Sequence, residues 1–388
     1  MNGREDSAAI PGAVPVDILF QPVRIGTMQV RNRIVMAPMT REFSPDGVPG
    51  SDVVEYYRRR AAGGAGLIVT EGMAVNAAGA HDGAIPMLFK REAVEASARI
   101  AAAVHAEGAA IVPQLWHVGV QDSPSQVNPL TVKSRPSRVG PSGLTGRGEA
   151  QGASLDEQGI SDTIEDFARA TAGARQAGFD GVEIHGAHGY LPDQFLWDRT
   201  NRRDDRYGGT ATERTRFLVD LIDACRRASG PDFPIILRMS QWKSSDYAAR
   251  LAETPQALEA VLAPLARSGI AAFHCSTRRF WEPGFAGSGL TLAGWVRKLT
   301  GLPTIAVGSV SLASEFKSGT TEVGGGIAES EAQPDNLDLV ARLIAAEEFD
   351  MIAVGRAMIA NPDWANLVRD RRGGELRPYT RSDLATLR

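Results

Sequence analysis

Short apolar runs alternate with longer stretches of helical periodicity through most of the chain. Strands that alternate with helices in this way indicate parallel βα units rather than a sandwich. The pattern therefore predicts an α/β fold, a TIM (β/α)8 barrel, with its site on the loops that leave the carboxyl ends of the strands. The predicted strands lie at 34–38, 67–71, 111–116, 181–185, 235–239, 271–275, 304–308 and 351–355, and helical patterns follow at 91–107, 161–177, 211–229, 254–268 and 334–347.

Two of these helices carry start signals. The segment 161–177 opens with Ser161 and an acidic first turn, as a capped helix does. The segment 254–268 opens with Thr254 followed by proline, a hydroxyl cap before a proline at the first helical position.

Three segments lie outside the repeat. Residues 16–32 read as a hairpin before the first strand, which we expect to close the floor of the barrel. Residues 117–160 are rich in Ser, Pro and Gly and follow the third strand; an insertion of this length is uncommon unless functional, and it would cap the mouth. Residues 317–333 read as a mobile loop.

Composition narrows the class of protein. The net charge is -4 and the basic residues are spread, so no surface is expected to hold a nucleic-acid backbone. The N-terminus lacks the basic and apolar regions of a signal peptide, and no run approaches the ~18 apolar residues of a membrane span. Two cysteines are too few for an iron–sulfur cluster. We expect a cytoplasmic protein.

The loops after the seventh and eighth strands carry glycines. In barrels these loops commonly form a phosphate site, where glycines let backbone N–H groups approach the anion. Gly308 and Ser309 follow one strand, and Gly355 and Arg356 follow the other. These positions indicate a phosphorylated substrate or FMN, although the glycines could also serve only as turn residues.

Gln114 and Arg238 lie on different strands but at the same mouth. A planar heterocycle with imide edges needs an amide that both donates and accepts, and a cation stabilises its anionic reduced form. Arg238 could equally pair with a neighbouring carboxylate. Thr40, after the first strand, could donate to the opposite carbonyl of such a ring or act as a cap.

The stretch EIHGAHGYL places two of the six histidines three residues apart. His185 and His188 could bind zinc with Glu183, which shares the strand face of His185 by alternation, but a catalytic site usually has a third histidine, Glu or Cys ligand. They could also be core histidines. The remaining interpretation is a pair of N–H donors for a developing oxyanion, with Tyr190 as a nearby proton source.

Five stretches together resemble the Old Yellow Enzyme family of FMN-dependent ene-reductases: NRIVMAPMTR (32–41), GAGLIVTEG (64–72), AGFDGVEIHGAHGYLPDQFL (177–196), TNRRDDRYGG (200–209) and VGRAMIANPDW (354–364). They occur in the family's order, and the resemblance runs from about Val16 to Leu387. It implies a single FMN-binding TIM-barrel domain at 16–388 after a disordered N-terminus at 1–15. NADPH or NADH would reduce the FMN, which would pass a hydride from N5 to the β-carbon of an activated alkene such as an enone, a nitroalkene or a quinone-like compound. A homodimer is implied by resemblance alone.

The resemblance also implies roles, residue by residue. His185 and His188 match the pair that binds the substrate's carbonyl or nitro oxygen, and Tyr190 matches the proton donor to the α-carbon. Trp116 matches a pocket wall, and Phe280 and Trp281 form either a lid over the pocket or a packed loop. The positions that match flavin contacts are Pro38, Met39, Thr40, Gly72, Gln114, His185, Arg238, Gly308, Ser309, Gly355 and Arg356.

Two positions depart from common members of the family. Thr40 stands where one branch carries a redox-tuning cysteine, and Ser309 replaces a common glycine of the phosphate loop. Other chemistries remain open on this scaffold: flavin-dependent oxidative demethylation, a flavin-free phosphosugar aldolase or isomerase, and a metal-dependent hydrolase. The aldolase lacks a well-placed Schiff-base lysine, since the nearest is Lys243 beyond the fifth strand.

Overall fold

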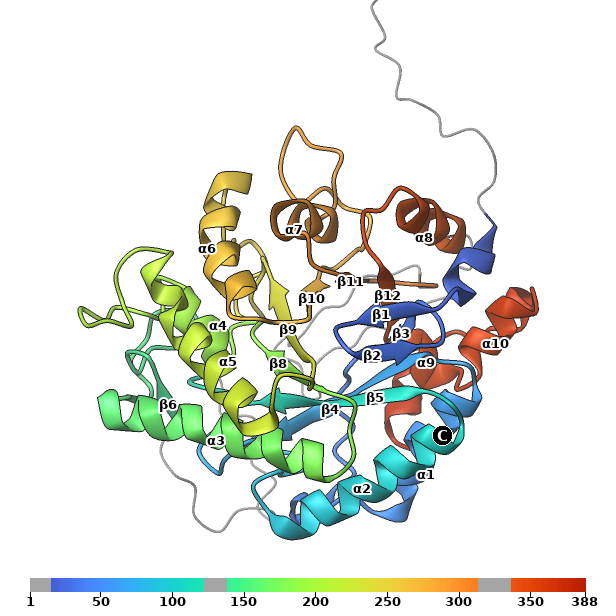
Figure 1. Cartoon of the computed structure of the whole chain (residues 1–388), viewed down its shortest axis with the longest axis horizontal. Coiled ribbons are helices and arrows are strands. Elements are labelled where there is room, and N and C mark those ends of the chain that lie inside the picture. Colours follow the sequence, from blue (N-terminus) through green and yellow to red (C-terminus); the bar gives the residue numbers. More distant parts are fainter. Residues whose placement is uncertain (1–14, 122–137, 313–335) are drawn as a thin grey trace, which may run out of the picture.

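A computed structural model describes residues 15–121, 138–312 and 336–388. Eight parallel strands close into a barrel in the order β10-β11-β12-β3-β4-β5-β8-β9, with helices around it (Figure 1). This is the predicted TIM barrel, and each predicted strand is confirmed at its place in the chain. The strands are β3 (Ile34–Met36), β4 (Leu67–Ala74), β5 (Ala110–Trp116), β8 (Val182–His185), β9 (Ile235–Ser240), β10 (Ala272–Ser276), β11 (Thr304–Val307) and β12 (Met351–Val354).

Most α-helices of the described part bury one face and expose the other, whereas the short helices at Leu191–Leu196 and Arg356–Ala360 are buried throughout. Most of the buried apolar residues of the helices belong to the larger hydrophobic cluster, which lies between the helices and the outer faces of the strands. The helices are α1 (Ser51–Ala62), α2 (Arg91–Ala106), α3 (Glu157–Gln176), α4 (Leu191–Leu196), α5 (Arg216–Ser229), α6 (Pro255–Arg267), α7 (Leu292–Thr300), α8 (Asn336–Ala345), α9 (Arg356–Ala360) and α10 (Trp364–Arg369). Short 3-10 helices lie at Val16–Phe20, Pro45–Gly47, Glu213–Thr215, Gly373–Glu375 and Arg381–Leu384.

One of the two predicted helix starts is wrong. Helix α3 begins at Glu157, and the side chain of Asp156 caps it by accepting the backbone N–H of Gly159 at 2.7 Å. Ser161 therefore lies inside the helix. The other start is confirmed, because the Thr254 side chain accepts the N–H of Ala257 at 3.2 Å and caps α6.

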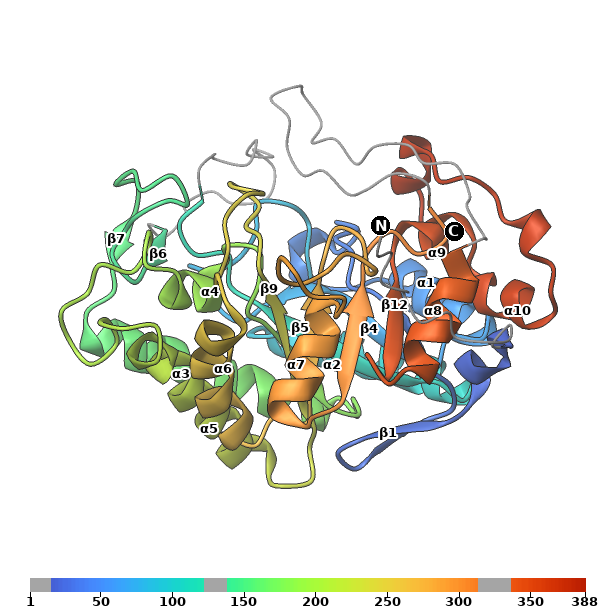
Figure 2. The same ribbon diagram turned by 90° about the horizontal axis from the view of Figure 1, so that it is seen from above.

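An N-terminal hairpin closes the floor of the barrel, as predicted. Strands β1 (Val23–Ile25) and β2 (Met28–Val30) pair antiparallel across a turn at Gly26, and the hairpin lies below the barrel in Figure 2. Gly26 has a φ of 57°, and a Cβ there would lie 3.3 Å from that of Ala271, just before β10. The hairpin side chains Ile25, Met28 and Val30 share one apolar cluster with residues of the barrel interior.

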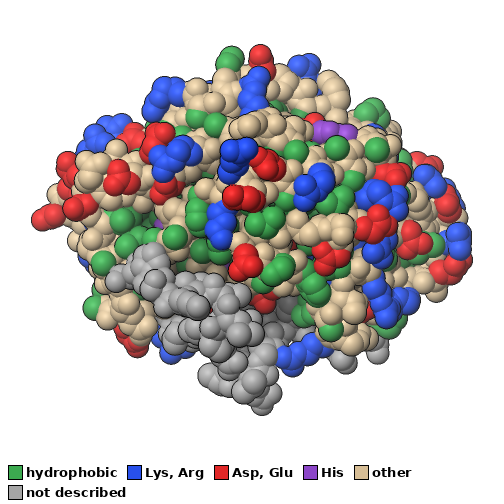
Figure 3. Space-filling view, turned by 90° about the horizontal axis from the view of Figure 1, so that it is seen from below, with side chains coloured by type: hydrophobic (Ala, Val, Ile, Leu, Met, Phe, Trp, Pro, Cys, Tyr) green, Lys and Arg blue, Asp and Glu red, His purple; other side chains and the backbone are tan. Residues whose placement is uncertain are grey.

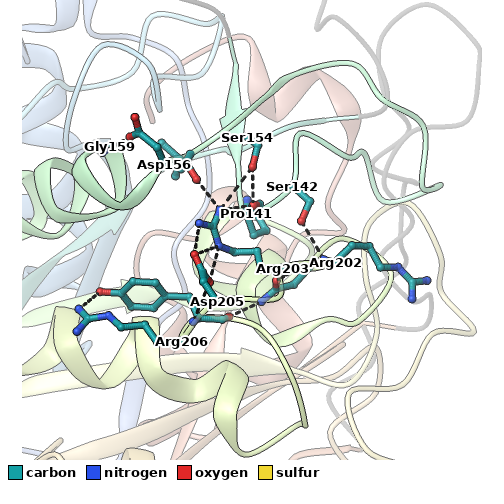
Figure 4. Close-up of polar contacts among 12 residues, drawn as sticks. Pro141, Ser142, Ser154, Asp156, Gly159, Arg202, Arg203, Asp205 and Arg206 are labelled. Atoms are coloured by element: carbon teal, nitrogen blue, oxygen red, sulfur yellow. Dashed lines mark hydrogen bonds and ion pairs between the residues drawn. The ribbon is translucent and has the colours of Figure 1, made fainter.

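The insertion after β5 carries two short strands, β6 (Val139–Gly140) and β7 (Ala153–Ser154), which pair parallel. Arg203 ties this region to the loop after α4 (Figure 4). Its guanidinium donates to the carbonyl oxygens of Pro141, at 2.7 Å, and of Leu155, and it also pairs with the carboxylate of Asp205. The NRRDDRY motif therefore holds the insertion against the barrel.

On the face in Figure 3, acidic and basic side chains are interspersed over the described surface. Ion pairs on the described surface include those of Arg58 with Glu55 and Glu107. Among the described helices, none combines the length and apolar character that a membrane crossing requires. Two predictions lie outside the described residues: the mobile loop at 317–333, and the disordered N-terminus at 1–15 except for Pro15.

Arg203→Met should loosen the insertion. The variant loses charge-assisted hydrogen bonds to two carbonyl groups, so we expect the free energy of unfolding to fall by about 2–4 kcal/mol and proteolysis within 139–155 to accelerate. Urea unfolding and limited proteolysis measure these effects. Arg202→Met is the matched control, because the Arg202 side chain is exposed and its backbone N–H makes the contact with Ser142. Equal behaviour of the two variants would contradict the role given to Arg203.

Candidate active site

The barrel interior changes from apolar to polar toward the carboxyl ends of the strands. Side chains that point inward repeat every second residue along a strand. Above the apolar floor, this alternation brings Glu183 and His185 of β8, Arg238 of β9 and His274 of β10 into the interior. His185, Arg238 and His274 are register partners on three adjacent strands. All four side chains are buried.

Glu183 lies at the centre of a buried hydrogen-bond network. Its Oε2 is 2.6 Å from Nδ1 of His274, and its Oε1 accepts from Nε2 of Gln114 at 2.8 Å. Burial raises the pKa of Glu183, but its interactions with His274, Arg238 and Gln114 outweigh burial and hold the pKa below its usual value. Burial lowers the pKa of His274. A carboxylate therefore faces a neutral imidazole whose Nδ1–H donates to it.

Three polar atoms next to this network have no hydrogen-bond partner among the described residues: Nδ1 of His185, Nε of Arg238 and Nε2 of His274. They belong to adjacent strands at one register level. Buried polar groups are nearly always satisfied, so such a group of unpaired atoms indicates a place for a polar ligand. A heterocycle with hydrogen-bonding edges fits this donor set. Glu183 is already paired with His274 and Gln114, so it is not available to complete a metal site with His185 and His188.

The turn after β8 holds His188 in a left-handed conformation, with φ of 64°. Its backbone N–H donates to Oγ of Ser240 at 3.0 Å, and its carbonyl oxygen accepts from the backbone and the hydroxyl of Ser244. Its Nε2 lies 2.8 Å from Oγ of Ser276. Contacts with the ends of β9 and β10 and with the loop after β9 therefore hold His188 in a backbone conformation that costs energy for any residue except glycine.

A buried ion pair lies under the same turn. Nζ of Lys243 is 2.5 Å from Oδ1 of Asp193, and both side chains are fully buried. The other carboxylate oxygen of Asp193 accepts the N–H of Gly189 at 2.7 Å. Lys243, the lysine nearest to a Schiff-base position but beyond the fifth barrel strand, is thus engaged in holding the turn between His188 and Tyr190.

His185, His188 and Tyr190 come together as expected. The ring centroids of His185 and His188 are 5.1 Å apart, and those of His185 and Tyr190 are 4.8 Å apart. Burial, supported by the charge of Arg238, lowers the pKa of both histidines well below 6.5. Burial raises the pKa of Tyr190 to about 12. At neutral pH the group therefore consists of two neutral imidazoles and a protonated phenol.

Aromatic rings line both sides of this group. Trp116 lies edge-to-face with Tyr190 at 5.1 Å and stacks on His81, also at 5.1 Å. On the other side, Trp242 stacks on His188 at 4.4 Å. The family resemblance implies that Trp116 is a pocket wall, whereas the sequence does not indicate Trp242 and His81, because both lie in loops whose paths no periodic pattern predicts.

The four candidate phosphate-loop residues lie at the ends of neighbouring strands, β11 and β12. A Cβ at Gly308 would lie 2.7 Å from the carbonyl oxygen of Thr277, so the backbone can follow this course only with glycine at position 308. Ser309 adopts a φ of 51°, and its hydroxyl donates to the carbonyl of Arg278 at 2.9 Å. Gly355 precedes α9, whose first residue, Arg356, is buried.

The remaining predicted flavin contacts lie at the ends of β3 and β4. Pro38 and Met39 are partly buried and Thr40 is exposed, so Thr40 is accessible to a ligand at the mouth. Gly72 lies beside a register shift in the β4–β5 pairing, and a Cβ there would lie 2.4 Å from the Trp116 ring. Glycine at this position lets the Trp116 ring lie close against the strand.

Phe280 packs within the hydrophobic core. It is 1% exposed, and its ring centroid lies 4.9 Å from that of Trp281 and 6.4 Å from that of Phe349, which precedes β12. Trp281 is partly buried against the same core. Of the two interpretations of this segment, the packing of Phe280 favours the packed loop over the lid.

Comparison with known proteins gives consistent matches. The sequence model of the NADH:flavin oxidoreductase / NADH oxidase family matches residues 18–324. The chain is 32% identical to an NADH oxidase of Thermoanaerobacter brockii over 369 residues, 92% of this chain. It is 31% identical to 12-oxophytodienoate reductase 7 of Oryza sativa subsp. japonica, covering 95% of this chain and 91% of the relative.

The relatives differ in length. The chain spans 52% of that NADH oxidase and 33% of a metal reductase of Desulforamulus reducens, with which it shares 41% identity over 225 residues, 58% of this chain. Among solved structures, the Old Yellow Enzyme homologue of Zymomonas mobilis matches with a TM-score of 0.73 and 27% identity. That match covers 94% of this chain and 96% of the homologue.

Lys243→Met should be strongly destabilising, because it leaves the Asp193 carboxylate buried without its cation. We expect the free energy of unfolding, measured in urea, to fall by about 3–5 kcal/mol. Adding Asp193→Asn should recover part of the loss, since a neutral amide oxygen can still accept the N–H of Gly189. Lys298→Met, at an exposed position, serves as the control. A loss below about 1 kcal/mol in Lys243→Met would show that the pair does not hold the turn.

Proposed function

The chain belongs to the NADH:flavin oxidoreductase / NADH oxidase family, that of Old Yellow Enzyme, and from this premise we propose that it is an FMN-dependent oxidoreductase reduced by NADH or NADPH. We further propose that its substrates are small activated alkenes: enones, nitroalkenes and quinone-like compounds. The observation that carries this proposal is the group of His185, His188 and Tyr190, held neutral beside the buried cation of Arg238.

The donor set fits the cofactor. Gln114 and Arg238 would hold the polar edge of the isoalloxazine, with Pro38, Met39, Thr40, Gly72 and His185 around it. The phosphate would lie against Gly308, Ser309, Gly355 and Arg356. When bound, FMN accepts a hydride from the nicotinamide and delivers it to the β-carbon of the alkene. Bound FMN would give hydrogen-bond partners to the buried nitrogen atoms of Arg238 and His185 that have none among the described residues.

His185 and His188 would bind the carbonyl or nitro oxygen of the substrate. Negative charge develops on this oxygen as the β-carbon is attacked, and preorganised N–H donors stabilise it in a site that excludes water. Neutral imidazoles can each present one N–H when a neighbour fixes the other ring nitrogen. Ser276, at 2.8 Å from Nε2 of His188, fixes that ring.

Tyr190 would deliver the proton to the α-carbon. Its phenol stays protonated at neutral pH because burial raises its pKa to about 12. Burial also makes the phenolate costly, so the proton must return from solvent after each turnover. The walls formed by Trp116 and Trp242 would restrict the pocket to flat substrates and keep bulk water away from the reacting carbons.

The alternative chemistries receive less support. A quaternary amine would place a cation near Arg238, which disfavours oxidative demethylation. Lys243, the candidate for aldolase chemistry, is fully buried in its pair with Asp193. We propose that residues 16–388 form one FMN-binding domain. That the protein is a homodimer remains a prediction.

Tyr190→Phe should separate the two half-reactions. Loss of the general acid should slow the alkene-dependent reoxidation of the reduced protein by about 10²–10⁴. Reduction by NADH or NADPH should change little, since the phenol takes no part in it. Anaerobic stopped-flow absorbance measures both steps separately.

Tyr207→Phe is the matched control, because Tyr207 is a buried tyrosine outside the site whose hydroxyl contacts Arg206 and Asp220. The wild-type reoxidation rate should stay flat from pH 7 to 9, since the histidines titrate below this range and Tyr190 above it. Unimpaired reoxidation in Tyr190→Phe would contradict the assigned proton donor.

A further inference from the structure

The interior pair of His274 and Glu183 has no part in the chemistry described above. Both side chains are fully buried inside the barrel, where packed apolar residues of similar volume would be at least as stable as an ionisable pair. Among the described residues, their hydrogen bond to a proposed flavin contact is the one that the Gln114 amide donates to Glu183. The pair therefore needs a role other than stability.

An ionised carboxylate only accepts hydrogen bonds. Glu183 is kept ionised because Nδ1 of His274 lies 2.6 Å from one carboxylate oxygen and Arg238 lies nearby. Gln114 must then turn an N–H toward Glu183, and its amide oxygen is directed away from the carboxylate. With a neutral or absent partner at Glu183, either end of the Gln114 amide could point in either direction.

We propose that His274 and Glu183 are positioning residues that fix the orientation of the Gln114 amide, so that its oxygen is presented to the imide N–H of FMN. This inference rests on the proposed function, because it concerns how FMN is recognised. His274 acts through Glu183 and Gln114. Removing its N–H should weaken the preference of the site for an isoalloxazine that can donate at N3.

Two further observations support this role. Nδ1 of His274 hydrogen-bonds Glu183, and this is the hydrogen bond that fixes the His274 ring among the described residues. His274 is also the register partner of Arg238, and strand pairing therefore fixes the distance between the network and the flavin-side cation. A change at His274 reaches the site through Glu183 and Gln114 rather than through the loops.

The test compares FMN with N3-methyl-FMN, which cannot donate at N3. Flavin is removed from the purified protein, and the Kd of each flavin is measured by fluorescence quenching. The wild-type protein should bind FMN at least about 10-fold more tightly than the analogue, as expected for one lost hydrogen bond in a buried site. The variants are His274→Leu, which removes the donor, His274→Asn, which keeps a donor near the position of Nδ1, and Glu183→Gln, which removes the charge.

His274→Leu and Glu183→Gln should raise the Kd of FMN about 10-fold and reduce the preference over the analogue to about 3-fold or less. His274→Asn should stay within about 3-fold of the wild-type Kd, a rescue that a merely structural role would not produce. His105→Leu, on the half-exposed end of α2, is the control and should bind as the wild type does. The visible spectrum of bound FMN should also shift in the Leu and Gln variants only.

A wild-type preference retained in both His274→Leu and Glu183→Gln would overturn the inference. If circular dichroism shows that His274→Leu does not fold, the other two variants test the inference. It is overturned if Glu183→Gln keeps the wild-type preference for FMN over the analogue, or if His274→Asn loses that preference. A wild-type protein that takes up no FMN at all contradicts the proposed function instead. The two failures are therefore distinguishable.

Discussion

The buried charge of Arg238 inside the barrel is the constraint on which the rest of the site depends. A guanidinium in a protein interior is costly unless other groups compensate for its charge. Glu183 supplies a negative charge nearby. Burial lowers the pKa of Arg238, and the attraction to Glu183 opposes that decrease. The same positive charge helps to keep His185 and His188 neutral. Burial and this cation therefore act together to keep the imidazoles of the polar layer neutral.

The second requirement is the turn after β8, which places His188 and Tyr190 beside His185. His188 accepts a left-handed backbone, and its own backbone and side-chain hydrogen bonds link it to Ser240, Ser244 and Ser276. The pair of Lys243 and Asp193 supports the turn from below. His188 thus combines the left-handed backbone with the role proposed for it, as a donor to the substrate oxygen next to the proposed proton donor Tyr190. Side chains from the ends of β9 and β10 and from the loop after β9 therefore converge on the turn that follows β8.

Most of the fold could be predicted from periodicity, because each βα unit repeats the same alternation of buried and exposed positions. The predicted start of α3 at Ser161 was wrong because Ser161 and Asp156 both precede acidic residues. Only the structure shows that the Asp156 side chain is the one that reaches the N–H groups of the helix. The site residues on strand ends were also predictable. His274 could have been found from its spacing of two from Ala272, which places both in the barrel interior. Trp242 could not, because it lies in a loop whose path depends on tertiary contacts.

The central claim is that this polar layer binds FMN and passes electrons from a nicotinamide to an activated alkene. The most direct measurement is the visible spectrum of the protein with FMN under anaerobic conditions, followed first with NADH or NADPH and then with 2-cyclohexenone. The account predicts a bound flavin spectrum that is bleached by the nicotinamide and restored by the enone. A protein that remains colourless and takes up no added FMN would contradict it.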